Sequence, residues 1–154
     1  MPTPPANPAN TAGRTANPMR VRALAVVGAV LADALIWLVA HGLFDLDLRI
    51  PDGPGSTSTS ELPLPAVIVA VPVVSLLGWG LLALLERFAP GRARTTWTVL
   101  AAAVVLLSLF APLFAEGLSA GNRVTLVLLH LTVGAFLIPA FRRTPAFRGG
   151  SVRT

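Results

Sequence analysis

Four long apolar segments constrain the fold of this chain more than any other feature. They cover residues 23–44, 62–85, 97–115 and 124–141 of the 154-residue chain, and each holds at most two ionisable residues. A helix of about 20 apolar residues crosses the hydrocarbon core of a bilayer, so we expect each segment to span a membrane once. The connecting segments are too short for a separate soluble domain. The sequence therefore predicts an all-α membrane protein, a four-helix transmembrane bundle within residues 21–141.

The segments outside these helices differ in composition. Residues 1–20 hold five prolines among Thr, Ala and Asn, and they lack the apolar surface that offsets the entropy cost of ordering; we expect a disordered tail. Residues 142–154 form a short basic tail. Apolar and charged residues alternate over residues 44–50, and a turn signal at residues 51–55 precedes a Ser/Thr run. This pattern predicts a short β-hairpin-like loop between the first two helices.

The distribution of arginine predicts the orientation. The chain has twelve basic residues, all arginine. Two of them, Arg49 and Arg123, fall on one predicted side of the membrane, and the other ten fall on the opposite side: Arg14, Arg20, Arg22, Arg87, Arg92, Arg94, Arg142, Arg143, Arg148 and Arg153. Because basic residues in short loops are retained on the cytoplasmic side, we expect a multi-pass protein of the cell membrane with both termini cytoplasmic and the hairpin outside.

Two other interpretations of the basic residues are disfavoured. The arginines form no contiguous patch with interleaved aromatic residues, so we expect attraction to anionic lipid headgroups and no binding of nucleic acid. Arg20 and Arg22 before an apolar run, with Ala-Asp-Ala at residues 32–34, also resemble a cleaved signal peptide. The apolar run continues through Val39, however, whereas the mature end of a secreted protein usually turns polar. An uncleaved helix fits better.

Asp33 is the most informative residue. An acid near the middle of a spanning helix costs about 2.5 to 3.5 kcal/mol on insertion scales, so it should face protein or water. Asp33 lies about 16 Å beyond Arg22 along its helix, and His130 lies about 18 Å from Arg142. The same arithmetic places Ser75 about 18 Å from Arg87, and Ser108 about 21 Å from Arg94. We therefore expect a mid-bilayer polar layer of four side chains: Asp33, Ser75, Ser108 and His130.

Helical spacing extends this layer. Trp37 and His41 follow Asp33 at i+4 and i+8, which predicts a stripe toward the outer surface. His130 and Gly134 share a face of the fourth helix, and the glycine allows another helix to approach closely. We expect the first and fourth helices to be in contact.

Three interpretations of Asp33 remain open. It can hydrogen-bond His130 or Ser75 and so fix the register of the helices. It can form a protonatable pair with His130 that exchanges with the outer surface through His41, since intramembrane Asp and His are common relay groups. It can also face a second copy of the chain or another membrane protein.

Other motifs offer little chemistry. The chain has no cysteine, and it contains no nucleophile elbow, metalloprotease motif or phosphate-binding loop. Three aspartates near residue 49 lack the spacing of a calcium loop, because Arg49 stands where a ligand is needed. We therefore expect no metal, no cofactor and no enzymatic activity.

Three local features have structural interpretations. Gly117 and Gly121 match the G-x-x-x-G pattern, but we place both in the short outer loop and interpret them as a turn. Trp97 is expected to anchor the inner end of the third helix at the membrane interface. Glu86 and Arg87 are expected to form an interfacial charge pair.

Several stretches resemble a known family. They are residues 45–49 (DLDLR), 78–87 (GWGLLALLER), 106–109 (LLSL) with Pro112, and His130-Leu131 followed by residues 137–139 (LIP). Over roughly residues 20–143 the chain resembles a family of small actinobacterial four-helix membrane proteins described as a domain of unknown function. The resemblance implies fold and location, and it implies no activity. A claudin-like plan is a more distant analogy, and the missing cysteine pair argues against it.

The sequence thus leaves two functional hypotheses. The first is a non-enzymatic accessory or assembly protein of the cell envelope, which works with another membrane protein or as a homo-oligomer in the bilayer. The alternative is a small proton-linked carrier or transporter that uses Asp33 and His130.

Overall fold

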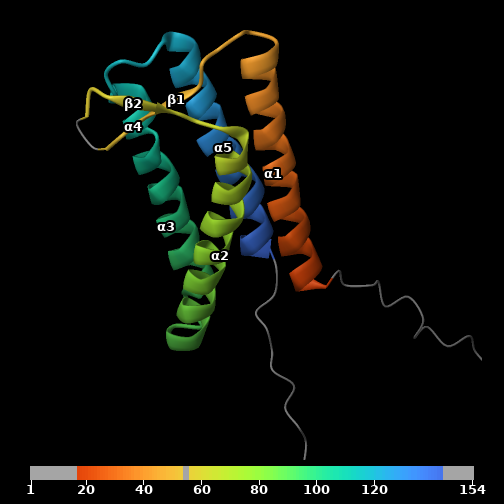
Figure 1. Cartoon of the computed structure of the whole chain (residues 1–154). Helices are drawn as coiled ribbons and strands as arrows, with labels where there is room; N and C mark the ends of the chain where they lie inside the picture. Colours follow the sequence, from red (N-terminus) through yellow and green to blue (C-terminus); the bar gives the residue numbers. More distant parts are fainter. Residues whose placement is uncertain (1–16, 54–55, 144–154) are drawn as a thin grey trace, which may run out of the picture.

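The computed structural model describes residues 17–53 and 56–143. In this part of the chain, four helices are long and apolar enough to cross a membrane, and a two-stranded antiparallel hairpin lies between the first two (Figure 1). The predicted fold class is therefore confirmed. Most of the two predicted tails lies outside the described residues.

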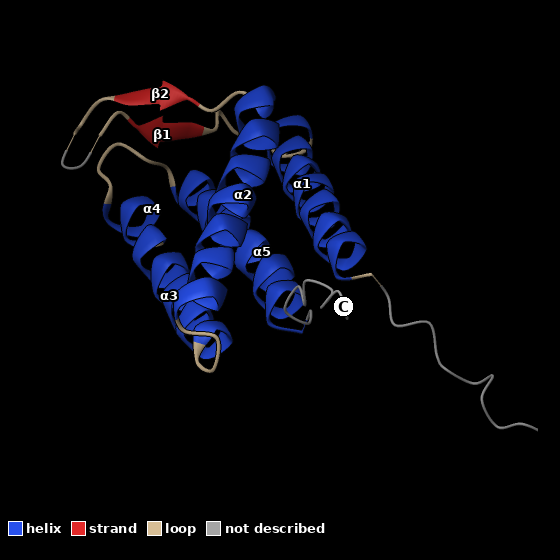
Figure 2. Ribbon diagram, turned by 90° about the horizontal axis from the view of Figure 1, so that it is seen from below, coloured by secondary structure: helices blue, strands red, loops and turns tan. Residues whose placement is uncertain are grey.

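The elements, in chain order, are α1 (Pro18–Gly42), β1 (Arg49–Pro51), β2 (Thr59–Glu61), α2 (Leu64–Phe88), α3 (Ala93–Ser108), α4 (Phe110–Phe114) and α5 (Ala120–Arg143). The long helices run up and down in the cyclic order α1–α2–α3–α5, and each packs mainly against its two neighbours (Figure 2). The predicted contact between the first and fourth spanning helices is present, and this contact of α1 with α5 is the most extensive in the bundle.

Three helices, α1, α3 and α5, begin earlier than the apolar segments do, and α1 and α5 each have a side-chain cap. The side chain of Asn17 accepts a hydrogen bond from the backbone N–H of Met19, and Pro18 occupies the first turn of α1. The hydroxyl of Ser119 accepts a hydrogen bond from the backbone N–H of Asn122 and caps α5. As a result α5 begins at Ala120 and not at Val124, and Gly121 lies inside this helix, which corrects its assignment to the outer loop. Gly117 does lie in a turn, with a φ of 76°.

The third spanning segment is divided into α3 and α4. The division follows Ser108, four residues before Pro112. Proline lacks the N–H that would bond the carbonyl four residues back, and its ring collides with that carbonyl. Leu109 instead donates its N–H to the carbonyl oxygen of Leu106 at 3.2 Å, a tighter turn.

Pro139, by contrast, does not close the last helix. It lies inside α5, which continues to Arg143.

The hairpin is shorter than its alternating sequence suggests. Arg49 pairs with Glu61, Ile50 with Ser60 and Pro51 with Thr59. Strand β1 begins only at Arg49, and Asp45, four residues earlier, has a φ of 51°, in the left-handed region. The alternation places Phe44 on the same face as Leu48, but Phe44 is exposed whereas Leu48 is buried.

Two apolar clusters form the interior of the bundle. The outer cluster, near the hairpin, comprises Val67, Leu118, Leu126 and Leu129. The inner cluster, near the opposite end, comprises Leu82, Trp97, Leu137 and Phe141. The outward faces of all four spanning segments carry exposed large apolar side chains, such as Leu31 and Leu77, over most of their length. Such a surface fits a lipid bilayer and not water.

Candidate functional site

The four polar side chains predicted at mid-membrane depth come from four different helices. Asp33 lies on α1, Ser75 on α2, Ser108 on α3 and His130 on α5. Asp33 and Ser75 are buried, each with 2% of its surface exposed, and the other two are half-buried. All four therefore point into the protein to some degree, away from lipid.

A cavity of about 330 Å³ brings three of the four together. Asp33, Ser108 and His130 line it, whereas Ser75 does not. The rest of its wall consists of aliphatic side chains from α2, α3 and α5, with Ile50 of β1 and Leu62 at the end near the hairpin. The cavity thus extends from the mid-membrane polar residues toward the hairpin.

The polar residues do not form a hydrogen-bonded network. The hydroxyl of Ser75 donates to the carbonyl oxygen of Val71 at 2.6 Å, and that of Ser108 donates to Val105 at 2.7 Å. His130 Nδ1 lies 2.7 Å from the carbonyl oxygen of Leu126. Each of these side chains bonds to the backbone of its own helix. The predicted hydrogen bond from Asp33 to His130 or Ser75 is not seen among the described residues.

Asp33 is the exception in this layer. Its Oδ1 is buried and has no hydrogen-bond partner among the described residues. A buried polar atom without a partner costs free energy, so this oxygen requires an explanation that the fold alone does not give. Its place in the wall of the cavity makes Asp33 the leading candidate for a functional residue.

The hydrogen bond between His130 and the carbonyl oxygen of Leu126 determines which ring nitrogen of His130 carries a proton. A carbonyl oxygen only accepts hydrogen bonds, so Nδ1 must carry the proton that it shares with Leu126. In the neutral ring, Nε2 is then an acceptor.

The predicted stripe continues from Asp33 along α1 toward the hairpin, and its side chains contact the loops. Trp37 Nε1 donates to the carbonyl oxygen of Leu62 at 2.8 Å, and His41 Nδ1 lies 3.3 Å from the carbonyl oxygen of Leu46. The centroids of the Trp37 and His41 rings are 4.7 Å apart. These bonds connect the outer end of α1 to both segments that flank the hairpin.

Close helix approaches depend on two glycines. Gly134 faces Val105 of α3, and a Cβ there would lie 3.0 Å from that side chain. Gly28 of α1 lies against the ring of Phe136 of α5, where a Cβ would lie only 2.8 Å from the ring. Gly28, which sequence reasoning missed, therefore lies at the α1–α5 contact, and Gly134 lies at the α3–α5 contact.

The inner end contains a second polar group. Trp97 is 3% exposed, donates its indole N–H to the carbonyl oxygen of Gly78 at 2.7 Å and packs on Phe141, so its assignment to the membrane interface is wrong. The guanidinium of Arg22 lies over the rings of Trp79 and Phe141, at 5.8 and 5.6 Å from their centroids.

Glu86 belongs to this inner group. The sequence pairs it with Arg87, but Glu86 is half-buried and near enough to Arg22 for electrostatic attraction, whereas Arg87 is exposed. The attraction between Glu86 and Arg22 acts between the inner ends of α1 and α2.

Asn122 is the other residue that sequence reasoning missed. Its side chain accepts a hydrogen bond from the backbone N–H of Arg49 at 3.3 Å and donates to the carbonyl oxygen of Arg49 at 2.9 Å. This pair of bonds fastens the hairpin to α5. The neighbouring Arg123 donates to three carbonyl oxygens at the end of α4 and in the following turn, those of Leu113, Ala115 and Leu118.

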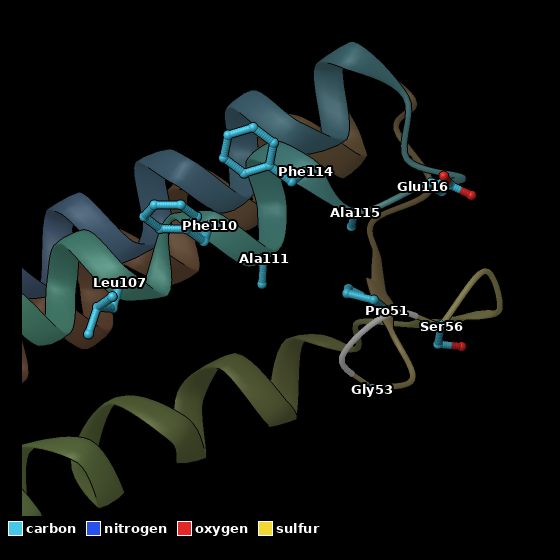
Figure 3. Close-up of a pocket in the computed structure, with 9 residues that line it drawn as sticks. All are labelled: Pro51, Gly53, Ser56, Leu107, Phe110, Ala111, Phe114, Ala115 and Glu116. Carbon is cyan, nitrogen blue, oxygen red and sulfur yellow. The ribbon is translucent and has the colours of Figure 1, made fainter.

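A larger hollow, of about 710 Å³, lies between α4 and the hairpin (Figure 3). Its wall is mainly apolar, and the carboxylate of Glu116 points away from Pro51 and Ala111. In residues 17–53 and 56–143, no group of three His, Asp or Glu side chains is arranged to hold a metal ion. The cavity at Asp33 is therefore the better candidate site.

The comparisons with known proteins agree with the resemblance seen in the sequence. A family model described as "Family of unknown function (DUF6069)" matches residues 13–146. The comparisons with curated proteins and with solved structures found no match. The match spans every helix and strand described above, and it assigns no activity. The actinobacterial origin stays a prediction.

Proposed function

We propose that this chain, which belongs to the family of unknown function DUF6069, is a non-enzymatic accessory or assembly protein of the cell envelope. The observation that carries the proposal is the apolar inner half of the bundle. Leu82, Trp97, Leu137 and Phe141 pack together between the cavity at Asp33 and the inner end. The space beside this cluster, about 330 Å³ between α2, α3 and α5, is lined almost entirely by apolar atoms.

The hydrogen bonds made by the polar side chains also support an accessory or assembly role. Trp37, Trp97 and Asn122 bond to backbone atoms of other elements and hold helices and loops in place. A chain whose polar side chains serve its own architecture, and whose outer faces are broad and apolar, is suited to binding another protein within the bilayer.

Site-specific photo-crosslinking tests this role. A photoreactive residue replaces one outward-facing leucine at a time, on α1 (Leu31), α2 (Leu77), α3 (Leu107) or α5 (Leu128), and native membranes are irradiated. We expect a discrete protein product from one face only, either a second copy or another membrane protein. The buried position Leu82, 1% exposed, serves as the control. Products with lipid alone from all four faces would contradict the proposal.

The proposal includes an orientation of the bundle in the membrane. Seven of the arginines predicted to be cytoplasmic lie at the end of the bundle where α1 begins and α5 ends, and Arg49 and Arg123 lie at the end with the hairpin (Figure 1). The positive-inside rule then favours a cytoplasmic location for both termini in the cell membrane.

A thiol-labelling experiment checks the orientation. The native chain has no cysteine. We expect a membrane-impermeant maleimide to label Ser56→Cys in intact cells, and to label Gly91→Cys only after lysis. The reverse pattern would invert the orientation.

The alternative function is a small proton-linked carrier, and the observation that favours it is the shared cavity of Asp33 and His130. In liposomes containing a pH-sensitive dye, this hypothesis predicts a proton flux that Asp33→Asn abolishes and Ser75→Ala preserves. An unchanged flux in Asp33→Asn would exclude the carrier.

A further inference from the structure

We infer that the cavity between α1, α2, α3 and α5 is a binding site for a small lipophilic ammonium ion. In this site the carboxylate of Asp33 neutralises the cationic group, and the apolar body of the ligand fills the space toward the hairpin. The inference does not depend on the accessory role proposed above.

The first argument is the missing counter-charge. Asp33 is 2% exposed, and its Oδ1 has no hydrogen-bond partner among the described residues. Arg22 is about 16 Å away along α1. At the outer end, Arg49 bonds to Thr59, and Arg123 bonds to backbone carbonyls. The described part of the protein offers this carboxylate no cationic partner. A ligand cation would supply one.

The second argument is the type of polar group in the wall. Ser108 donates its hydroxyl proton to Val105, so its oxygen can only accept from a ligand. His130 donates through Nδ1, so Nε2 is an acceptor in the neutral ring. Together with Asp33, all three polar residues of the wall offer acceptors. A primary ammonium carries three donors and matches such a wall.

The third argument is the remainder of the wall. The other lining residues are Val, Leu, Ile and Ala. A bare metal ion needs several more oxygen ligands than this wall offers, and a hydrated ion would meet hydrocarbon on most sides. A volume of about 330 Å³ lies at the lower end of the range for small-molecule sites. The ligand should therefore be compact and mostly apolar.

The test uses the full chain in nanodiscs of phosphatidylcholine, with 1-adamantylamine as the probe. The control ligand, 1-adamantanol, has the same cage and no charge. Calorimetric titrations are corrected with empty nanodiscs, because both ligands partition into lipid. We expect saturable binding of the amine that is about tenfold or more tighter than that of the alcohol. Equal binding of the two, or no amine binding above empty nanodiscs, would overturn the inference.

Three variants locate the site. Asp33→Asn keeps the size of the side chain and removes its charge, so the preference for the amine should disappear. Val71→Phe places a ring in the cavity wall and should abolish binding of both ligands. Ser75→Ala removes a buried polar group at the same depth that does not line the cavity, and it should leave both affinities unchanged. A preference that survives in Asp33→Asn, or that is lost equally in Ser75→Ala, would place the binding elsewhere.

Discussion

The indole N–H of Trp97 on α3 donates to the carbonyl oxygen of Gly78 on α2 at 2.7 Å. Trp97→Phe keeps an aromatic ring against Phe141 and removes the donor, so we expect a loss of about 1 kcal/mol in the free energy of unfolding. Trp97→Ala should cost about 3–5 kcal/mol, because it also leaves a cavity in the inner cluster. Both are measurable by SDS titration followed by circular dichroism. Val99→Ala, at an outward-facing position, is the control, and an equal loss there would refute the interpretation.

Asn122 should control how firmly the hairpin is held. Asn122→Ala removes both hydrogen bonds to the backbone of Arg49, for an expected loss of about 2 kcal/mol. The hairpin should then open more often, and trypsin should cleave after Arg49 faster in nanodiscs. Thr125→Ala is the matched control, since Thr125 is buried one turn along and its hydroxyl bonds within its own helix, to Gly121. An unchanged cleavage rate in Asn122→Ala would show that other contacts hold the hairpin.

Replacement of Asp33 by an apolar residue should stabilise the protein. Asp33 has a buried oxygen without a partner, and the adjoining cavity leaves space for a larger side chain. We expect Asp33→Leu to raise the free energy of unfolding by about 1–3 kcal/mol in SDS titrations. Loss of stability would instead indicate that Asp33 fixes the register of the helices. Ser75→Ala, at the same depth, should change stability little.

The hairpin should respond to acid through Asp52. The hydroxyls of Ser60 and Ser58 stabilise the carboxylate of Asp52 and lower its pKa below the ordinary value. Because the pKa is lower in the folded hairpin, this contribution to stability is complete above the ordinary pKa and is lost as the pH falls through the lowered one.

Carboxyl-carbon NMR titration measures this effect. Ser60→Ala should raise the midpoint of Asp52 toward the ordinary value, whereas Thr98→Ala, on α3, should leave it in place. An Asp52 midpoint that Ser60→Ala does not move would show that the hydroxyl of Ser60 does not stabilise the carboxylate.

The four long apolar helices were predictable because they depend on length, hydropathy and the rise per residue. Axial arithmetic places Asp33 and His130 at one depth, and both do line one cavity. It does not give the rotation of each helix about its axis. For that reason Ser75 falls outside the cavity, and Trp97 faces the core and not the membrane interface.

Contacts between distant segments could not be predicted in the same way. Asn122 bonds to Arg49, 73 residues earlier, and no local pattern marks such a pair. The helix starts at Pro18 and Ala120 do have a local signal, in the caps Asn17 and Ser119, but the hydropathy of the apolar segments does not reveal them.

The α1–α5 contact forms late in biosynthesis, because its two helices are far apart along the chain. The ribosome makes α1 first and α5 last, yet these two helices share the most extensive contact in the bundle. Until α5 enters the membrane, the face of α1 with Gly28 lacks Phe136, and Asp33 lacks the helix that carries His130. An acidic residue of α1 therefore stays without this neighbour, exposed on that side, through the synthesis of α2 and α3. Arrival of the last helix completes the cavity wall and ends that exposure.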